Sequence, residues 1–404
     1  MEIEFSSVIT IDISRPKLED ITKSFIDVLG VVVKDFFQKI LLEFAEHYMQ
    51  EPIKPFSCDR CGNNRDFIWK THHGKPTKLY TVFGLLELLQ MQIECKACGH
   101  KMYLTRKLLE VEPRKRVPLA TIRKLGLIGA LTTYRVAHKI VGMFGIVLDK
   151  MTVWRCVQKL SEQIKLAIDP QERAAAEADG TGIPIRGIDK RGKEMKVLVQ
   201  LKKLGGVRIA GLSIGNYDSE WDKLFKPLIP VLQCFKEFLL ITDGDTSILK
   251  GLGDTVKVLF QRCLWHIPHQ FKWYLWKDGV KHKSDEWKDA FSKLLDVVNV
   301  KSLIDDKAKE CVENIIILKR MHLDALIAIC KKNEWKRCTT YLENAKEDLF
   351  VSLSNRLNGK TTSHAERVMR TMNMRINVGK WSPLGALNAT KVRLAYYYNG
   401  FDVE

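Results

Sequence analysis

Hydrophobic and polar positions follow two different periods along the chain, and each period predicts a different kind of element. Apolar residues recur at helical spacing in residues 1–50, through KSFIDVLGVVVKDFFQKILLEFAEHYMQ, and predict a helix or a helix pair. Residues 51–110 contain strand-like pieces, among them DFIWKTH and KLYTVFGLLELLQMQIEC. Residues 118–168 return to a helical pattern with two short breaks, which predicts three short helices.

The period changes again after about residue 170. A predicted meander of three strands, EADGTGIPIRGI, EMKVLVQLKKL and GVRIAGLSIGNY, precedes a helix and the strands FLLITDGD and VKVLFQRCLWHI. Residues 270–355 are helical in pattern almost throughout, SHAERVMRTMNMRINV predicts one last helix, and the aromatic tail VRLAYYYNGF follows. We therefore expect an α/β domain over residues 171–404 that is interrupted by a helical insertion at about 270–355.

Length and charge add two expectations. A chain of 404 residues exceeds the size at which a single core usually stops growing, so two or three domains are expected. A formal net charge of +17 favours a polyanionic partner, above all nucleic acid, although excess lysine can also serve solubility alone. The sequence has no apolar run long enough for a membrane span and no signal-type start, so a soluble, cytoplasmic protein, associated with the nucleoid of a prokaryote, is expected.

Ten cysteines outside a secretory context suggest thiols and metal ligands, and their spacing selects four of them. Cys58, Cys61, Cys95 and Cys98 form two C-x2-C pairs, and each pair is followed by glycine, in CDRCGN and CKACGH. Two such turns complete a tetrahedral shell of four thiolates, which predicts a structural zinc site in a segment at 51–110; four buried cysteines by chance are the alternative. The other unpaired cysteines are expected in the core; these are Cys156, Cys234, Cys311, Cys330 and Cys338.

The helical segment at 111–170 has the layout of a helix-turn-helix DNA-binding domain. If Thr152 caps its last helix, then Trp154, Arg155 and Lys159 lie near the first exposed turns, where a recognition helix presents side chains to the major groove. A plain three-helix bundle that only connects domains is the alternative, and Trp154 can equally be a core anchor.

Three carboxylates carry the candidate chemistry. Asp179 lies in EADGTGIPI, Asp243 ends the apolar strand FLLITD, and Glu366 begins the last predicted helix. If the first and fourth strands are neighbours, as in a ribonuclease H-like sheet, Asp179 and Asp243 lie side by side and Glu366 can reach both. Such an oxygen-only cluster suits two Mg²⁺ ions about 4 Å apart, which assist in-line phosphoryl displacement.

Each acid also has a structural alternative. Asp179 precedes Gly180, as is common in turns, and the segment from Asp243 to Asp245 can simply cap a following helix. Glu366 comes three residues after a serine, as in a capping box.

A further pair of residues follows the last predicted strand. RCLWHIPHQF contains Cys263 and His266 with two residues between them. The helical insertion offers them no second C-x2-C or H-x3-H pair, so they make a poor zinc site. A histidine satisfied within the core is the alternative for His266.

The order of these motifs resembles the DDE transposases of the Mutator-like type and related prokaryotic insertion-sequence transposases, over about residues 175–400. The resemblance rests on the acids, on the C-x2-H between Asp243 and Glu366, and on the helical insertion. It implies a ribonuclease H-like catalytic core behind zinc-knuckle and helix-turn-helix segments. The sequence SHAERVMR departs from the family, whose members often have asparagine ahead of the Glu-Arg pair.

The resemblance also implies an activity, which is metal-dependent DNA cleavage at transposon ends followed by strand transfer into target DNA. Asp179 and Asp243 would bind both Mg²⁺ or Mn²⁺ ions, Glu366 would complete the second, and His266 would touch DNA or a phosphate nearby. Arg367 and Arg370 would contact double-stranded DNA, the terminal inverted repeats and the target, and a homodimer or higher oligomer would act. The alternatives are a domesticated, non-catalytic DNA-binding regulator and a ribonuclease H-like nuclease or resolvase.

Overall fold

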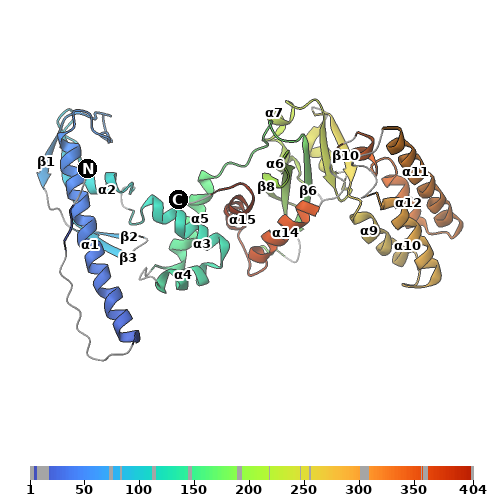
Figure 1. Cartoon of the computed structure of the whole chain (residues 1–404), viewed down its shortest axis with the longest axis horizontal. Helices are drawn as coiled ribbons and strands as arrows, with labels where there is room; N and C mark the ends of the chain where they lie inside the picture. Colours follow the sequence, from blue (N-terminus) through green and yellow to red (C-terminus); the bar gives the residue numbers. More distant parts are fainter. Residues whose placement is uncertain are drawn as a thin grey trace. The chain divides into compact units, whose positions relative to one another are not determined.

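The computed structural model describes residues 4–6, 18–71, 76–81, 84–111, 115–143, 148–188, 193–217, 219–245, 247–253, 256–300, 309–355, 357 and 363–401. The chain forms two compact units, one that extends to Gln163 and one that begins at Ile164 (Figure 1). No helix of the described ranges is long and apolar enough to cross a membrane.

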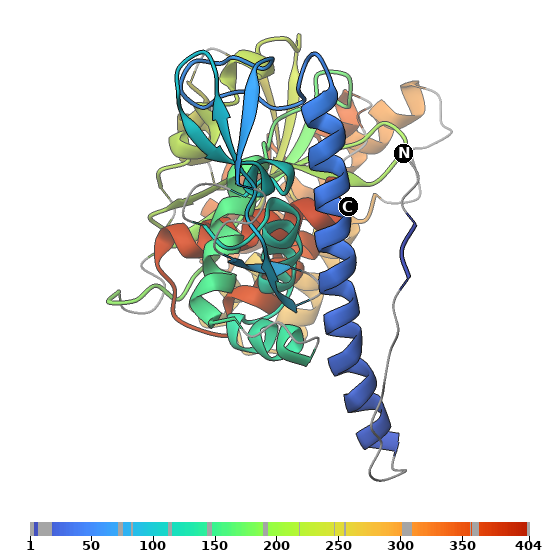
Figure 2. The ribbon, with the colours of Figure 1, turned by 90° about the vertical axis from the view of Figure 1, so that its left-hand side faces the viewer.

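The first unit begins with one long helix rather than a helix pair, α1 (Leu18–Gln50) (Figure 2). It continues with five short strands and a short helix: β1 (Phe67–Thr71), β2 (Thr77–Thr81), β3 (Gly84–Leu88), β4 (Gln92–Cys95), β5 (Lys101–Tyr103) and α2 (Leu104–Leu108). β1, β4 and β5 form an antiparallel sheet, and β2 and β3 form a hairpin. Leu41 and Ala45 of α1 share one apolar core with Leu79 and Ile93 of the strands.

Three helices close the first unit: α3 (Leu119–Leu131), α4 (Tyr134–Met143) and α5 (Lys150–Gln163). Two glycines let α3 approach α5 closely, because a Cβ on Gly129 would come within 2.7 Å of a Val153 methyl group. A Cβ on Gly126 would come within 2.9 Å of the Cys156 carbonyl oxygen. The two helices therefore pack almost backbone to backbone.

The second unit contains a mixed sheet of five strands: β6 (Ala175–Gly182), β7 (Glu194–Leu201), β8 (Val207–Gly215), β9 (Phe238–Thr242) and β10 (Val258–Arg262). Their order across the sheet is β10-β9-β6-β7-β8. The first three strands in sequence form the antiparallel meander that the pattern predicts, while β9 pairs in parallel with β6 and β10 pairs in parallel with β9. The first and fourth strands in sequence order, β6 and β9, are therefore neighbours in the sheet.

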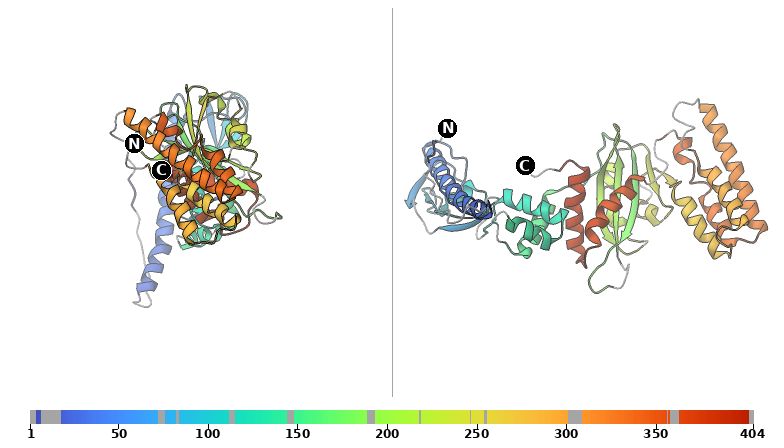
Figure 3. Two further views of the ribbon diagram at one scale, coloured as in Figure 1. Left: turned by 90° about the vertical axis from the view of Figure 1, so that its right-hand side faces the viewer. Right: turned by 60° about the horizontal axis from the view of Figure 1, so that its bottom comes forward.

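Helices cover both faces of this sheet. One face packs through residues such as Ala178, Leu198 and Leu240 against three short helices: α6 (Asp222–Phe225), α7 (Ile229–Leu232) and α8 (Ser247–Leu252). α14 (Ser363–Ile376) packs against β6 and β7, and α15 (Pro383–Tyr398) packs against α14 and β8 (Figure 3). The expectation of an aromatic tail after a last helix is wrong, because the sequence VRLAYYY forms the end of α15, with Val392, Leu394 and Ala395 buried.

A helical block lies between β10 and α14. It comprises α9 (His266–Lys277), α10 (Asp285–Val298), α11 (Lys309–Lys332), α12 (Lys336–Ala345) and α13 (Val351–Ser354). The block has an apolar core of its own, which includes Phe271, Leu294 and Leu342. Gln261 of β10 donates a hydrogen bond to the Leu349 carbonyl (2.7 Å) and accepts one from the Ser352 amide (2.9 Å). The block therefore leaves the sheet and returns to it at the same strand.

Candidate functional site

Four cysteines of the first unit form a group that could hold a metal ion. The sulfur atoms of Cys58, Cys61, Cys95 and Cys98 all lie within 4.8 Å of one another. The distances are 3.6 Å between Cys58 Sγ and Cys98 Sγ and 3.7 Å between Cys61 Sγ and Cys95 Sγ. A tetrahedron with zinc–sulfur bonds of about 2.3 Å has sulfur–sulfur edges of about 3.8 Å. The cysteine group thus fits a structural Zn²⁺, as in a zinc ribbon.

The glycine after each cysteine pair has a conformational role. Gly62 and Gly99 have positive φ angles of 73° and 68°. Their amides donate hydrogen bonds to the carbonyls of Cys58 (3.0 Å) and Cys95 (2.8 Å), which closes two equivalent turns. Glycine adopts this left-handed conformation without the steric cost of a side chain.

The prediction that the other cysteines lie in the core is only partly confirmed. Cys156, Cys330 and Cys338 are buried, and burial raises the pKa of the Cys156 and Cys330 thiols to about 12. Cys234 and Cys311 are exposed, so the prediction was wrong for them. An isolated cysteine in a helical pattern does not show which face of the helix it occupies.

Asp179 and Asp243 lie on neighbouring strands of the second unit. Glu177 pairs with Ile241 in the parallel β6–β9 register, so two more residues along each strand bring Asp179 level with Asp243, directly after β9. Side chains alternate between the faces of a sheet, and the face of Ala178 packs on α6 to α8. Asp179 and Asp243 therefore share the opposite face, the one that α14 covers.

Glu366 lies in the first turn of α14, and a buried acid that the sequence analysis missed anchors this turn. The amide of Ala365 donates a hydrogen bond to Glu177 Oε2 (2.7 Å), although the two residues are 188 positions apart. Burial raises the pKa of Glu177 to about 8. Ser363 is already helical, so the capping box considered for Glu366 does not describe this terminus. A polar residue two positions before Asp179, within an apolar strand, is the signal that was available.

His266 joins the acids from the helical block. It is the first residue of α9, and its Nε2 atom lies 3.3 Å from Glu366 Oε1. Burial opposes protonation of the imidazole, but its contact with Cys263 and the charges of Asp179 and Asp243 raise the pKa of His266 to about 9. Cys263 is fully buried, and its amide donates to the Thr242 carbonyl (2.7 Å), so it packs under the turn that carries His266.

The strand register and the contact of His266 with Glu366 bring the four predicted side chains near one another, and their charges affect the pKa of Asp179. Burial is the largest cause that raises the pKa of Asp179 to about 7. The hydrogen bond from the Gly180 amide lowers this pKa, and the negative charges of Asp243 and Glu366 raise it further. We call Asp179, Asp243, Glu366 and His266 the acid cluster.

The loop after β9 is held by Asp245 rather than by Asp243. The Asp245 carboxylate accepts hydrogen bonds from the Ser247 amide (2.8 Å) and hydroxyl (2.6 Å) and from Trp221 Nε1 (3.2 Å). The helix-capping alternative therefore applies to Asp245. Asp243 is exposed, and its carboxylate accepts the Asp245 amide (3.0 Å).

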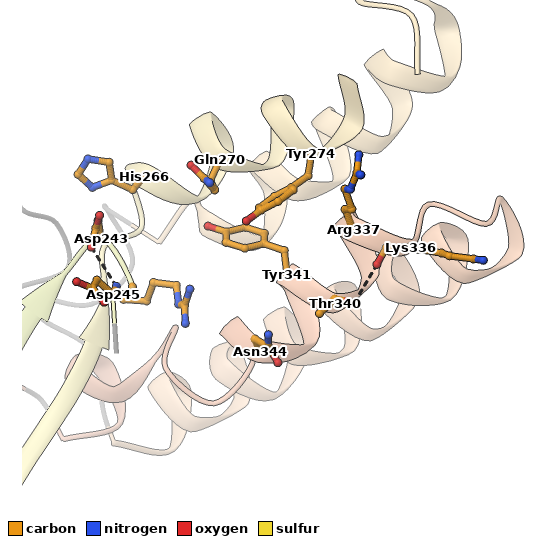
Figure 4. A pocket seen from close by; sticks show the side chains of 12 residues that line it. Asp243, Asp245, His266, Gln270, Tyr274, Lys336, Arg337, Thr340, Tyr341 and Asn344 are labelled. Atoms are coloured by element: carbon orange, nitrogen blue, oxygen red, sulfur yellow. Dashed lines mark hydrogen bonds between the residues drawn. The ribbon is translucent and has the colours of Figure 1, made fainter. Parts of the chain in front are cut away.

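A cavity of about 930 Å³ adjoins the acid cluster (Figure 4). Gln270 and Tyr274 of α9 line one side, and the rings of Tyr274 and Tyr341 of α12 lie 4.9 Å apart. The full lining comprises Asp243, Gly244, Asp245, Arg262, His266, Gln270, Tyr274, Lys336, Arg337, Thr340, Tyr341 and Asn344. Three cationic side chains, from Arg262, Lys336 and Arg337, thus share one cavity with Asp243 and His266.

The predicted DNA-binding residues lie on two helices. Arg367 and Arg370 are exposed on α14. The other candidates lie on α5 of the first unit. Arg155 is exposed there, and three side chains are half-buried: Thr152, Trp154 and Lys159. The condition that Thr152 caps this helix is not met, because α5 begins at Lys150 and the Thr152 amide already donates to the Asp149 carbonyl (2.8 Å). A DNA-binding role for α5 stays a prediction.

The acid cluster and the cysteine group differ in compactness. Within the described part of the chain, only the four cysteines bring three or more metal-ligand atoms within 4.8 Å of one another. The acid cluster instead offers oxygen donors from three separate elements, arranged around one imidazole. Carboxylate oxygens are the donors that hard cations prefer, and an imidazole is a group that can donate a hydrogen bond or a proton to an anion.

The sequence was compared with models of protein families and with curated proteins, and neither comparison found a match.

Proposed function

We propose that the chain cuts DNA at transposon ends and joins the freed strand to target DNA, as a DDE transposase with a ribonuclease H-like catalytic core. The parallel pairing of β6 with β9 carries the proposal, because it brings Asp179 and Asp243 to one sheet face beside α14. The strand order, with an antiparallel meander followed by two parallel strands, supports the ribonuclease H-like assignment.

The donor set supports Mg²⁺ or Mn²⁺ rather than a softer metal. Asp179, Asp243 and Glu366 offer only carboxylate oxygens, which are the ligands that such hard cations prefer. Asp179 and Asp243 would bind both ions, and Glu366 would complete the second. Two ions in such a site activate an attacking oxygen and stabilise the leaving one.

His266 has a separate role in this proposal. An imidazolium beside Glu366 donates a hydrogen bond to an oxygen of the bound phosphate and offsets part of its negative charge. A neighbouring carboxylate orients the ring, as Glu366 does at 3.3 Å.

The chain has positive charge suited to DNA. Arg262, Lys336 and Arg337 line the cavity beside the acid cluster, and the net charge of the chain is +17. Each cation that neutralises a phosphate releases a counterion, so binding of double-stranded DNA should weaken steeply with salt. The α3–α5 helices would recognise the transposon ends, the zinc ribbon would support this docking, and two or more copies would act together on the paired ends.

The proposal is tested with oligonucleotide duplexes that carry the inverted repeats flanking the gene, in Mg²⁺ and in Mn²⁺. Asp179→Asn, Asp243→Asn and Glu366→Gln should each lower cleavage by about 10³-fold or more while end binding, measured in Ca²⁺, stays near that of the parent. Asp222→Asn is the matched control, because Asp222 is an exposed acid on the α6 side of the sheet, and it should cut normally.

The other outcomes discriminate among the alternatives. If all three variants cut like the parent, the acid cluster is not catalytic. Cleavage without joining of the freed 3′ end would favour a nuclease or a resolvase. A parent that binds ends in a sequence-specific way but cuts in neither metal would be a non-catalytic regulator.

A further inference from the structure

The most exposed tryptophans of the chain are gathered at one helix. Trp265, Trp273 and Trp276 are 49%, 47% and 63% exposed. The other six tryptophans, all of them described, are buried or half-buried: Trp69, Trp154, Trp221, Trp287, Trp335 and Trp381. Large aromatic surface is costly to leave in water, so three exposed indoles on α9 and its first flanking residue need an explanation.

These tryptophans share one face of α9 with a histidine. Trp265, His269, Trp273 and Trp276 recur at helical spacing, and the rings of Trp265 and His269 lie 4.3 Å apart. We call these four side chains the aromatic stripe. α9 buries three other residues in the core of the helical block: Ile267, Phe271 and Leu275. The core of the block is thus complete without the stripe.

Lysines flank the stripe. Lys277 Nζ lies 5.2 Å from the ring centre of Trp273 and 4.9 Å from that of Trp276. Lys272 directly precedes Trp273, and its Nζ lies 4.4 Å from the ring centre of Phe291 on α10. Asp278, which directly follows Lys277, is already engaged, because its carboxylate accepts the backbone amides of Arg337 (3.2 Å) and Cys338 (2.9 Å). The surface therefore combines exposed rings with positive charge.

The stripe begins at the acid cluster. The ring of Trp265 lies 5.0 Å from that of His266, whose Nε2 contacts Glu366. From Trp265 to Trp276 the helix rises about 16 Å, at about 1.5 Å per residue. At a stacking distance of about 3.4 Å, this length corresponds to about five nucleotides of one strand.

We infer that the aromatic stripe of α9 binds an unpaired single strand of DNA that leads into the acid cluster. Indole and imidazole rings stack on any base, and neighbouring lysines neutralise the phosphates, which together give affinity without sequence preference. A paired duplex does not offer the faces of its bases, so the stripe selects unpaired DNA. The inference rests on the proposed function for one point only, which is that the strand ends at a reacting phosphate.

The test uses the full chain in EDTA, where no cutting occurs, with a fluorescein-labelled 12-nucleotide oligodeoxythymidylate and a blunt duplex of mixed sequence as probes. The variant Trp265→Ala/Trp273→Ala/Trp276→Ala should bind the single strand at least about 50-fold more weakly, since each lost stacking contact weakens binding about fivefold or more. Duplex binding should change less than about threefold. The corresponding triple Phe variant, which keeps three rings, should recover most of the affinity.

A second triple variant provides the matched control. Ile317, Leu318 and Met321 are also exposed apolar residues of the helical block, on α11. Their replacement by alanine should leave single-strand binding within about twofold of the parent. Circular dichroism of each variant verifies that the helices are retained.

Several results would overturn the inference: a parent that does not bind the single strand, an alanine variant that binds it like the parent, or an equal loss for single strand and duplex. A stripe variant that turns a dimer into a monomer without affecting the single strand would make the surface a contact between copies. A parent that binds the single strand through the stripe but cuts no DNA would support the inference while contradicting the proposed function. A parent that cuts DNA but does not bind the single strand through the stripe would contradict the inference and leave the proposed function standing.

Discussion

The cysteine group and the acid cluster are both candidate metal sites, but the chain assembles them by different means. Cys58 and Cys98 lie 40 residues apart: a glycine turn closes each C-x2-C pair, and the antiparallel pairing of β1 with β4 brings the two pairs together, so that these two sulfurs lie 3.6 Å apart. Glu366 lies nearly 190 residues from the strand that carries Asp179. The β6–β9 register, the packing of α14 on the sheet, the Glu177 bond to α14 and the return of the helical block together bring the acids close. Strand pairing over a short stretch of chain, together with two tight turns, gives a compact site, whereas pairing over a much longer stretch gives a more open one.

This difference corresponds to two kinds of chemistry. Cys58 and Cys95 are buried, and four thiolates would fill every position around one ion. Asp243 is exposed and adjoins a cavity of about 930 Å³, so a large substrate can reach the acids. The cysteine group is suited to stabilising a fold, and the acid cluster is suited to acting on a ligand.

The strongest test of the comparison removes the cysteine group. Cys95→Ser combined with Cys98→Ser should abolish one equivalent of bound zinc and unfold the surrounding strands, because structural zinc sites contribute on the order of 10 kcal/mol. Metal analysis and circular dichroism measure both effects. Cys234→Ser combined with Cys311→Ser, at two exposed cysteines outside the cysteine group, is the control and should keep its zinc. A full equivalent retained by the first variant would assign the metal to another site, with Cys263 and His266 the first to examine.

A smaller change should disable the acid cluster while zinc remains bound. Gly244 has a φ of +108°, and a Cβ there would come within 2.4 Å of Arg262 Nη1. Gly244→Ala should therefore strain the backbone next to Asp243 and shift the Arg262 side chain, which lines the same cavity, and should lower DNA cleavage by about 100-fold, in assays with the flanking repeats. Gly253→Ala also strains a positive φ, +62°, but a Cβ there meets nothing within 4 Å, so cleavage should stay near that of the parent. Equal losses would mean that backbone strain alone matters.

The link between β6 and α14 can be weakened in a graded way. Glu177→Ala leaves the buried Ala365 amide without its acceptor and should cost about 1–3 kcal/mol of unfolding free energy. Glu177→Gln keeps an acceptor oxygen of the same size, so its cost should be the smaller of the two. Differential scanning calorimetry of both proteins measures the order. If Glu177→Gln lowers the unfolding free energy as much as Glu177→Ala does, the hydrogen bond from Ala365 does not hold α14 on the sheet.

Thiol reactivity gives the finest test. Cys156 and Cys330 have pKa values raised by burial to about 12, so their thiols stay protonated at pH 8 and should resist iodoacetamide with or without a chelator. The four cysteines of the zinc site should become alkylated only after zinc is removed. Peptide mass spectrometry follows each residue. Rapid labelling of Cys156 in the untreated protein would show that α5 opens easily.

Much of this fold follows from pattern alone, and the exceptions have physical reasons. The five strands of the second unit, its helical block and the cysteine turns were predictable, because periodicity and C-x2-C spacing are local signals. α15 was missed because Tyr396 and Tyr397 at its end suggested a tail, although Ala386, Ala389 and Leu394 face the core. Glu177 was missed because its partner is a backbone amide on a distant helix, which no side-chain pattern records. The exposure of Trp273 and Trp276 was equally hidden, since a helical pattern does not show which aromatic residues a fold leaves in solvent.

The hydrogen bonds of the Gln261 side chain have a consequence for how the helical block could be altered. This side chain bonds both to Leu349, just before α13, and to Ser352 within α13, so the start and the end of an excursion of more than 80 residues meet at one amide group. A segment whose ends already meet can be lengthened, shortened or removed at little cost in loop-closure entropy. A short linker from Leu264 to Phe350 should therefore replace helices α9 to α12 while the five-stranded sheet is retained.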